Sequence, residues 1–317
     1  MTSLLPYSGN SDYCYPNSLR MSLQAAGMHP LPDTGFLECL TTLPFGKMYL
    51  DLADGPIAFF SNLAVNPDQG LSLALKALGW TCEERRGQTA DEALASLRAA
   101  VSEAPALIGP VDLGYLSYNP FARDLAGGDH FVLALAIEDE TILLHDPWKF
   151  PCASLPISEF MQAWRAERID YAEQPYTFRA HFSQLEQVSL EETIARTLST
   201  IADNLKVEQN GPVAYTNVHA LHMLAASLRS NHVPSSISES LTTFVLPLGA
   251  RRGLDAAAFL REAKQSRAAH CMEQQAMLCG QAQYLAAHNR FSEVADLITR
   301  LSEVEQELIE RLLATAV

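Results

Sequence analysis

The stretch DHFVLALAIEDETILLHDP, residues 129–147, decides the fold class of the first half of the chain. Two apolar runs flank the acidic turn at residues 138–140, a pattern typical of a β-hairpin. His130 then begins one strand and Asp146 ends the next, so both side chains lie at the same end of the hairpin. A carboxylate there can hold a histidine ring in one tautomer and stabilise the imidazolium. Taken alone, the pattern fits equally well a histidine that opens a buried strand and an ordinary Asp-Pro turn.

A cysteine near the N-terminus supplies the group that His130 would serve. Cys14 precedes Pro16, which a first helical turn tolerates, and apolar residues follow at helical spacing up to Gly27, a natural stop. Cys14 is therefore expected at a helix N-terminus, where unpaired N–H groups and the helix dipole stabilise a thiolate and can hold an oxyanion. The alternative is a small buried cysteine in a helix cap. We predict Cys14 as nucleophile, His130 as acid/base and Asp146 as the orienting carboxylate.

Composition and charge exclude several classes of function. The chain has 317 residues, 48% hydrophobic and 19% charged, which indicates a globular protein of about two domains. Its net charge of −15 disfavours extended binding to nucleic acid or to an anionic membrane. No apolar run approaches the roughly 18 residues of a membrane span, so we expect a cytoplasmic protein. The six cysteines lack short paired spacings, and no disulfide framework, metal site or cofactor is predicted.

The order Cys, His, Asp, with the cysteine early and the other two on adjacent strands, resembles papain-like cysteine enzymes, and in particular the bacteriocin leader-peptide peptidases. The segment GPVDLGYLSY, residues 109–118, the strand after it and residues 38–46 are similar to the butirosin biosynthesis protein H family. That family carries a helical C-terminal domain. The resemblance implies an α+β chain with a papain-like catalytic domain at 1–180 and an all-helical domain at 181–317.

The same resemblance implies acyl transfer in natural-product biosynthesis, as in antibiotic pathways. The namesake of the family moves an aminoacyl group from a carrier-protein thioester to an amine of an aminoglycoside. The expected partners are therefore a thioester donor, either a small thioester or an acyl carrier protein, and a small-molecule acceptor. Two alternatives use the same three residues with water as acceptor, a cysteine peptidase or amidase and a thioester hydrolase. A third alternative is a catalytically silent binding module.

The oxyanion donor departs from the papain-like pattern, which places a Gln a few residues before the cysteine. No Gln lies there in this chain, and Asn10 is the best substitute, with Ser8 second. Many family members have Gly after the cysteine, whereas Tyr15 and Pro16 follow it here. Tyr15 could narrow access to the thiol, which makes it a pocket candidate.

Three further residues are candidates for the substrate pocket. Asp112 could shape it, although a turn-stabilising aspartate is an equally good interpretation. Tyr115 and Tyr118 could line a substrate channel, although loop aromatics are often only packing residues.

The second half of the chain has the periodicity of a helical module. Ser189 and Glu192 form a capping-box pattern before one helix, and apolar residues at helical spacing predict a second over residues 218–228. Asp255 is the expected N-cap of a third helix running towards Tyr284, and residues 297–312 form the last apolar stripe. Such stripes need a partner surface, so the helical part is expected to cover the cleft or form a homodimer.

The acidity of the chain bears on the donor, because carrier proteins are usually acidic as well. A carrier-bound donor requires a local positive patch near Cys14. The candidates for that patch are Arg20, Lys47, Arg85, Arg86 and Arg123.

Overall fold

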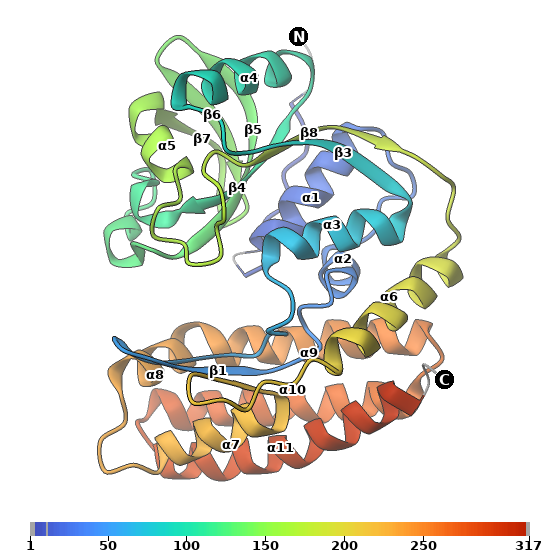
Figure 1. Ribbon diagram of the computed structural model, residues 1–317, viewed down its shortest axis with the longest axis vertical. Helices are drawn as coiled ribbons and strands as arrows, with labels where there is room; N and C mark the ends of the chain where they lie inside the picture. The colour runs from blue at the N-terminus through green and yellow to red at the C-terminus, as the bar shows by residue number, and fades with distance from the viewer. Residues whose placement is uncertain (1–3, 11, 315–317) are drawn as a thin grey trace. The chain divides into compact units, whose positions relative to one another are not determined.

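The computed structural model describes residues 4–10 and 12–314, and the chain divides into two compact units (Figure 1). The first unit comprises residues 1–37 and 78–187, and the second comprises residues 38–77 and 188–317. These units differ from the two continuous ranges expected from the sequence, because residues 38–77 group with the helical part. The reason is strand pairing across a long stretch of chain: β1 (Met48–Leu52) pairs with β9 (Ala214–Thr216).

The first unit is built on a six-stranded antiparallel sheet with the strand order β3-β8-β4-β5-β6-β7. Helices α1, α4 and α5 and two short 3₁₀ turns complete it, and α2 (Thr34–Leu40) spans the boundary between the units. The bounds are α1 Cys14–Ala25, β3 Trp80–Arg85, α4 Ala90–Glu103, β4 Ala106–Asp112, η1 Leu113–Tyr115, η2 Ala122–Leu125, β5 Asp129–Glu138, β6 Thr141–Asp146, β7 Phe150–Pro156, α5 Ile157–Trp164 and β8 Phe178–Gln184.

The predicted hairpin is confirmed. Strands β5 and β6 pair antiparallel from Glu138 opposite Thr141 to Leu133 opposite His145. The turn places Asp139 at a φ of 43°, a conformation that Asp tolerates better than most residues. His130 is the second residue of β5 and Asp146 is the last of β6, so both lie at the same end of the hairpin.

Alternation along β5 separates two packed faces of this sheet. Val132 and Ala134 join a core that includes Phe160 and Trp164 of α5 together with the apolar face of α4. Phe131, one position away, meets Tyr15 of α1 edge-on, with ring centroids 5.9 Å apart. Successive strand residues point to opposite faces, so α1 lies on one side of the sheet and α4 and α5 on the other (Figure 1).

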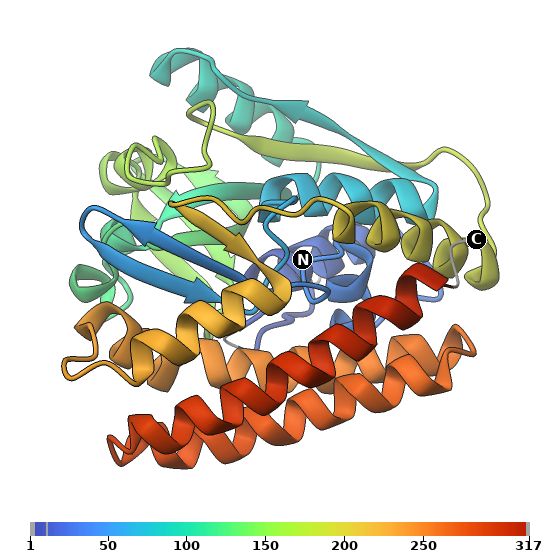
Figure 2. The same ribbon diagram turned by 60° about the horizontal axis from the view of Figure 1, so that its bottom comes forward.

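The second unit combines a small antiparallel sheet, in the order β2-β1-β9, with a set of helices. Its core joins Tyr49, Ala58 and Phe60 of the sheet region to apolar residues of α7, α10 and α11, and Figure 2 shows α10 and α11 lying side by side. The bounds are β2 Gly55–Phe59, α3 Pro67–Leu78, α6 Leu190–Leu205, α7 Asn217–Leu228, α8 Ser235–Ser240, a π-helical turn at Leu241–Val245, α9 Leu246–Glu262, α10 Ser266–Ala287 and α11 Phe291–Ala314.

Most helices of this unit follow the sequence pattern. The Ser189 hydroxyl accepts the N–H of Glu192 at 3.1 Å and so caps α6 as expected. The predicted start at Asp255 is wrong, because Asp255 lies inside α9. The chain instead breaks between α9 and α10, where Lys264 has a φ of 59°. The α+β class, with helices following a sheet-containing part, is confirmed. In the described part of the chain, no helix has the length and apolar character needed to span a membrane.

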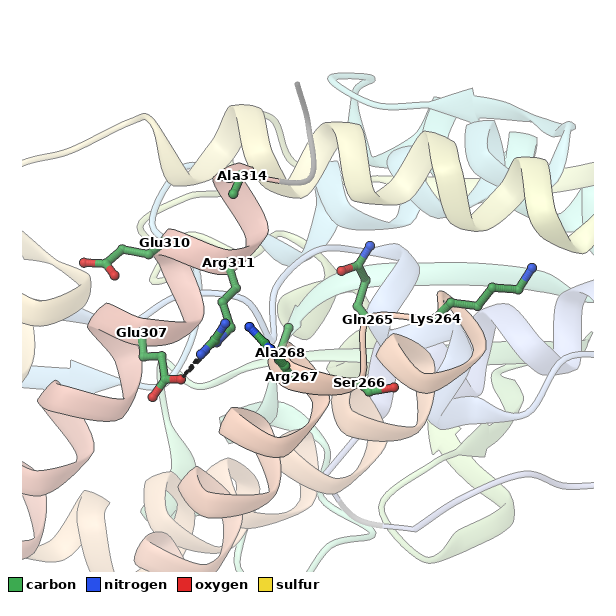
Figure 3. A pocket seen from close by; sticks show the side chains of 9 residues that line it. All are labelled: Lys264, Gln265, Ser266, Arg267, Ala268, Glu307, Glu310, Arg311 and Ala314. Atoms are coloured by element: carbon green, nitrogen blue, oxygen red, sulfur yellow. Dashed lines mark hydrogen bonds and ion pairs between the residues drawn. The ribbon is translucent and has the colours of Figure 1, made fainter.

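The polar features of the second unit have structural partners. Lys47 is buried and lies 3.1 Å from Glu305, which also accepts Gln275 Nε2 at 2.7 Å. Near the C-terminal end of α11 a surface hollow of about 520 Å³ mixes basic Lys264, Arg267 and Arg311 with acidic residues (Figure 3). Arg311 Nε donates to Glu307 Oε1 across 2.9 Å. The mixture of both signs of charge is typical of a solvated surface.

Candidate active site

Cys14 is the first residue of α1, as the sequence indicated. Tyr13 precedes it as N-cap and makes no side-chain capping bond, so no side chain of the N-cap occupies the positive end of this helix. Pro16 brings no N–H, and the N–H of Asn17 donates to the Tyr13 carbonyl at 3.0 Å. The N–H of Cys14 belongs to the first turn, whose donors have no acceptor within the helix. Cys14 itself is half-buried and carries a free thiol.

The His130 and Asp146 side chains are joined by a short hydrogen bond. His130 Nε2 lies 2.6 Å from Asp146 Oδ1, and both residues are buried. The same carboxylate oxygen accepts the backbone N–H of Trp148 at 2.7 Å, and the second oxygen accepts the Tyr118 hydroxyl at 2.8 Å. Three donors therefore fix the plane of the carboxylate and, through it, the ring of His130.

The pKa of His130 shows which charges surround the ring. Burial opposes protonation most strongly, yet the charges of Asp146 and Cys14, and hydrogen bonds to both side chains, hold this pKa well above its ordinary value. Since Nε2 faces Asp146, the hydrogen bond to Cys14 uses the other ring nitrogen. The geometry and electrostatics therefore favour an imidazolium held between the Cys14 sulfur and the Asp146 carboxylate.

The pKa values of Asp146 and Tyr118 shift in directions that agree with a charged His130–Asp146 pair. For Asp146, burial works against ionisation, but the His130 charge and hydrogen bonds from His130, Trp148 and Tyr118 bring its pKa below the ordinary value. For Tyr118, burial and the nearby Asp146 charge raise the phenol pKa well above its ordinary value. Tyr118 therefore stays protonated and remains a donor to the carboxylate.

The N-terminal segment is fastened to the turn that carries Asp146. The Tyr7 hydroxyl donates to the Asp146 carbonyl at 2.8 Å and accepts the Lys149 N–H at 3.0 Å. Gly9 is needed for this close approach, because a Cβ there would lie 2.6 Å from the Pro147 carbonyl and closer still to the Tyr7 hydroxyl. Tyr7 and Gly9 are thus held by the same turn that carries Asp146, the carboxylate partner of His130.

The two candidate oxyanion residues have different surroundings. Asn10 Oδ1 accepts Asn17 Nδ2 at 2.7 Å, which places Asn10 beside the first turn of α1. The Ser8 hydroxyl accepts Arg20 Nη1 at 2.7 Å, and Arg20 Nε also donates to the Pro32 carbonyl. Asn10 thus contacts the first turn of α1, whereas the Ser8 hydroxyl is held by Arg20, and the oxyanion role of either residue stays a prediction.

Three of the pocket candidates have packing or loop-holding contacts. Tyr15 is buried against Phe131 in the interior of the unit. Asp112 Oδ1 accepts the N–H groups of Gly114 and Gly127 at 2.8 and 3.0 Å, and its Oδ2 accepts Arg168 Nε at 2.7 Å. These contacts favour the turn-stabilising interpretation of Asp112. Half-buried Tyr115 stacks on the same Arg168, whose guanidinium lies 4.9 Å from the ring centroid.

Three residues of this region escaped the sequence analysis, namely Tyr7, Asn17 and Trp148. Asn17 sits one helical turn after Cys14 and could have been noticed as a polar residue on the same face. Trp148 follows Asp146 by two residues, at the spacing of an Asx turn, with its ring 6.4 Å from that of His130. Tyr7 has no comparable signal, because its contacts depend on the fold.

Comparison with known proteins gives similarities of three kinds. A family model described as the YobF C-terminal domain matches residues 211–313. Over 306 residues the chain is 26% identical to an uncharacterised protein, YobF, of Bacillus subtilis (strain 168), covering 95% of this chain and 96% of that one. A crystal structure of a protein provisionally assigned as a C39-like peptidase, from Bacillus anthracis, matches with a TM-score of 0.38 and 17% identity, covering 57% of this chain and 96% of that one. The butirosin protein H resemblance stays a prediction.

Proposed function

We propose that the chain is a cysteine-dependent acyltransferase of natural-product biosynthesis that takes an acyl or aminoacyl group from a thioester and passes it to an amine or hydroxyl through acyl-Cys14. The observation that supports this most strongly is a pair of contacts that share His130. The ring contacts Cys14, and its Nε2 lies 2.6 Å from Asp146 Oδ1. A nucleophile, an acid/base and an orienting carboxylate in that order are what nucleophilic acyl transfer requires.

In the first step the Cys14 thiolate attacks the thioester carbonyl carbon. The carbonyl electron pair moves to oxygen, and the Cys14 N–H and the Asn10 amide are the proposed donors to that oxyanion. Collapse of the intermediate breaks the bond to the donor sulfur. His130 gives its proton to the departing thiolate and becomes neutral.

Acylation also prepares His130 for the second step. Part of the rise in its pKa comes from the negative charge of Cys14, and this charge disappears when the sulfur is acylated. The buried ring is then easier to keep neutral, so it can take a proton from the incoming amine or hydroxyl. The acceptor attacks the acyl carbon, the Cys14 sulfur leaves, and the thiolate–imidazolium pair is restored.

The nature of the donor remains part of the proposal. Of the residues that a carrier protein could use, Lys47 is buried beside Glu305, and Arg85 and Arg86 are ion-paired with Glu83 and Glu84. These pairs reduce the positive charge that could attract an acidic carrier. We therefore place a small thioester ahead of a carrier-bound one as the first donor to test.

Incubation of the protein with the acetyl thioester of N-acetylcysteamine tests the proposal by intact mass. We expect one acetyl group on Cys14, none in Cys14→Ser, and discharge of that group by an added amine faster than by water. Discharge at the same rate with and without amine would instead identify a thioester hydrolase. Turnover of peptides without thioester acylation would identify a peptidase, and no acylation with any of these substrates would contradict the catalytic assignment.

A further inference from the structure

The hydrogen bonds around Asn17 determine which way its side-chain amide faces. Asn17 is buried, and its Nδ2 lies 2.8 Å from the Tyr13 carbonyl oxygen and 2.7 Å from Asn10 Oδ1. A carbonyl oxygen can only accept, so the atom facing Tyr13 must be the amide nitrogen. On the other side, Asn17 Oδ1 accepts the Thr34 hydroxyl at 2.9 Å, which agrees with the same orientation.

This orientation determines the orientation of Asn10 in turn. The Asn17 amide nitrogen has two hydrogens, one directed to Tyr13 and one to Asn10, so the Asn10 atom that receives the second must be an acceptor. Asn10 therefore presents Oδ1 to Asn17 and holds its NH₂ group on the opposite side. Asn17 is three residues after Cys14 on α1 and so shares its helix face, which keeps the whole arrangement beside the nucleophile.

We infer that Asn17, supported by Thr34, is a positioning residue that sets the Asn10 amide as an oxyanion donor to the carbonyl attacked by Cys14. The inference rests on the proposed function and adds the residues on which its oxyanion site depends. Asn10 is oriented from the nucleophile helix itself through Asn17, so the proposed donor and the nucleophile are fixed to the same helix.

Two rates measured on Asn17→Ala test the inference. Acetylation of Cys14 by the N-acetylcysteamine thioester needs an oxyanion donor, whereas alkylation of the same thiol by iodoacetamide forms no oxyanion. We expect the rate of acetylation to fall about 10- to 100-fold, which is at most the effect of removing a whole oxyanion donor. The rate of alkylation should be nearly unchanged. Equal loss in both reactions, or loss in neither, would overturn the inference while leaving Cys14 as nucleophile.

A double-mutant cycle with Asn10→Ala shows whether Asn17 acts through Asn10. If it does, adding Asn17→Ala to Asn10→Ala causes little further loss of acetylation. Independent, multiplying losses would contradict the inference.

Should Asn17→Ala fold poorly, Thr34→Val removes the supporting donor at nearly constant volume. Thr34→Ser keeps that donor and serves as the matched control, which should stay at the wild-type rate.

Side-chain amide relaxation by ¹⁵N NMR gives a readout that needs no substrate. The Asn10 NH₂ signal, assigned by its absence in Asn10→Ala, should be rigid in the wild type and in Thr34→Ser. It should become mobile in Asn17→Ala. An Asn10 amide that is equally ordered in both would overturn the positioning role even if the protein transfers no acyl group, and failure of acylation in the wild type would count against the proposed function alone.

Discussion

Two cysteine–histidine pairs of the first unit, Cys14 with His130 and Cys152 with His145, differ in what each histidine contacts. His130 has a carboxylate on Nε2 and Cys14 on its other nitrogen. His145 is equally buried, but its Nε2 lies 3.0 Å from the Leu5 carbonyl and its Nδ1 lies 3.1 Å from the backbone N of Cys152. The Cys152 sulfur is 4.0 Å from that same Nδ1. Proximity of thiol and imidazole is therefore common to both pairs.

The hydrogen bonds of His145 fix its tautomer. A carbonyl accepts only, so Nε2 must carry the hydrogen, and a backbone N–H donates only, so Nδ1 must supply its lone pair. Because the Nδ1 lone pair already accepts the Cys152 N–H, it is not available as a base for the Cys152 thiol. His130, by contrast, gains from protonation through Asp146. In such a pair, the histidine can act as acid and base when the ring nitrogen that faces the thiol is available and the other ring nitrogen contacts a carboxylate, as in His130.

The largest expected difference between the pairs is in turnover. His130→Ala should lower acyl transfer by about 10³-fold or more, because both the acid and the base steps are lost. The matched change His145→Ala should preserve transfer and instead lower the free energy of unfolding by about 1–3 kcal/mol, because buried partners lose their hydrogen bonds. Steady-state transfer rates and urea unfolding of both variants give the comparison. Similar turnover by His130→Ala and the wild type would refute the mechanism.

His130 contacts a charged carboxylate, whereas His145 contacts an uncharged carbonyl. Replacing the Asp146 carboxylate by a neutral amide should lower acyl transfer less than His130→Ala does. Asp146→Asn can keep the bonds to His130 and Trp148, while its new NH₂ group donates to the Tyr118 hydroxyl. Partial activity should remain, because the bond that orients His130 is kept while the negative charge is lost. Loss of the negative charge lowers the His130 pKa, so the imidazolium is lost at a lower pH and the basic limb of the rate profile shifts down. A basic limb that does not move would contradict the assignment of Asp146.

The less exposed of the two thiols should be the more reactive one. Cys152 is exposed and Cys14 is half-buried, yet iodoacetamide at neutral pH should modify Cys14 faster by at least about tenfold, since only Cys14 combines a helix N-terminus with an imidazolium. Peptide mapping after brief labelling, with Cys152→Ser as control, measures the ratio. Faster labelling of Cys152, Cys82 or Cys271 would count against the proposed nucleophile.

The parts of this account that the sequence predicts are local in the chain. Pro16 and the apolar spacing predict a helix starting at Cys14, and two apolar runs around a short acidic turn predict the hairpin that aligns His130 with Asp146. The parts that escaped prediction depend on distant contacts. Tyr7 reaches Asp146 only in the folded unit, and the pairing of β1 with β9, which assigns residues 38–77 to the helical unit, has no signature in either segment alone.

Tyr118 illustrates an intermediate case. The sequence suggested that Tyr118 could line a substrate channel, and in the structure its hydroxyl donates to Asp146. A sequence pattern can bring a residue to the right region because the segment is short and bounded by strands. Which atom it meets depends on side-chain packing that no local pattern encodes.

An NMR titration of His130, followed through its ¹³Cε1 signal in the wild type and in Cys14→Ser, tests the thiolate–imidazolium pair directly. We predict a wild-type pKa well above the ordinary value of 6.5, because the Cys14 and Asp146 charges outweigh burial, and a clear fall when serine removes the negative charge of the sulfur. A wild-type His130 that titrates at or below 6.5, or one whose pKa is the same in Cys14→Ser, would contradict the thiolate–imidazolium pair on which the proposed chemistry rests.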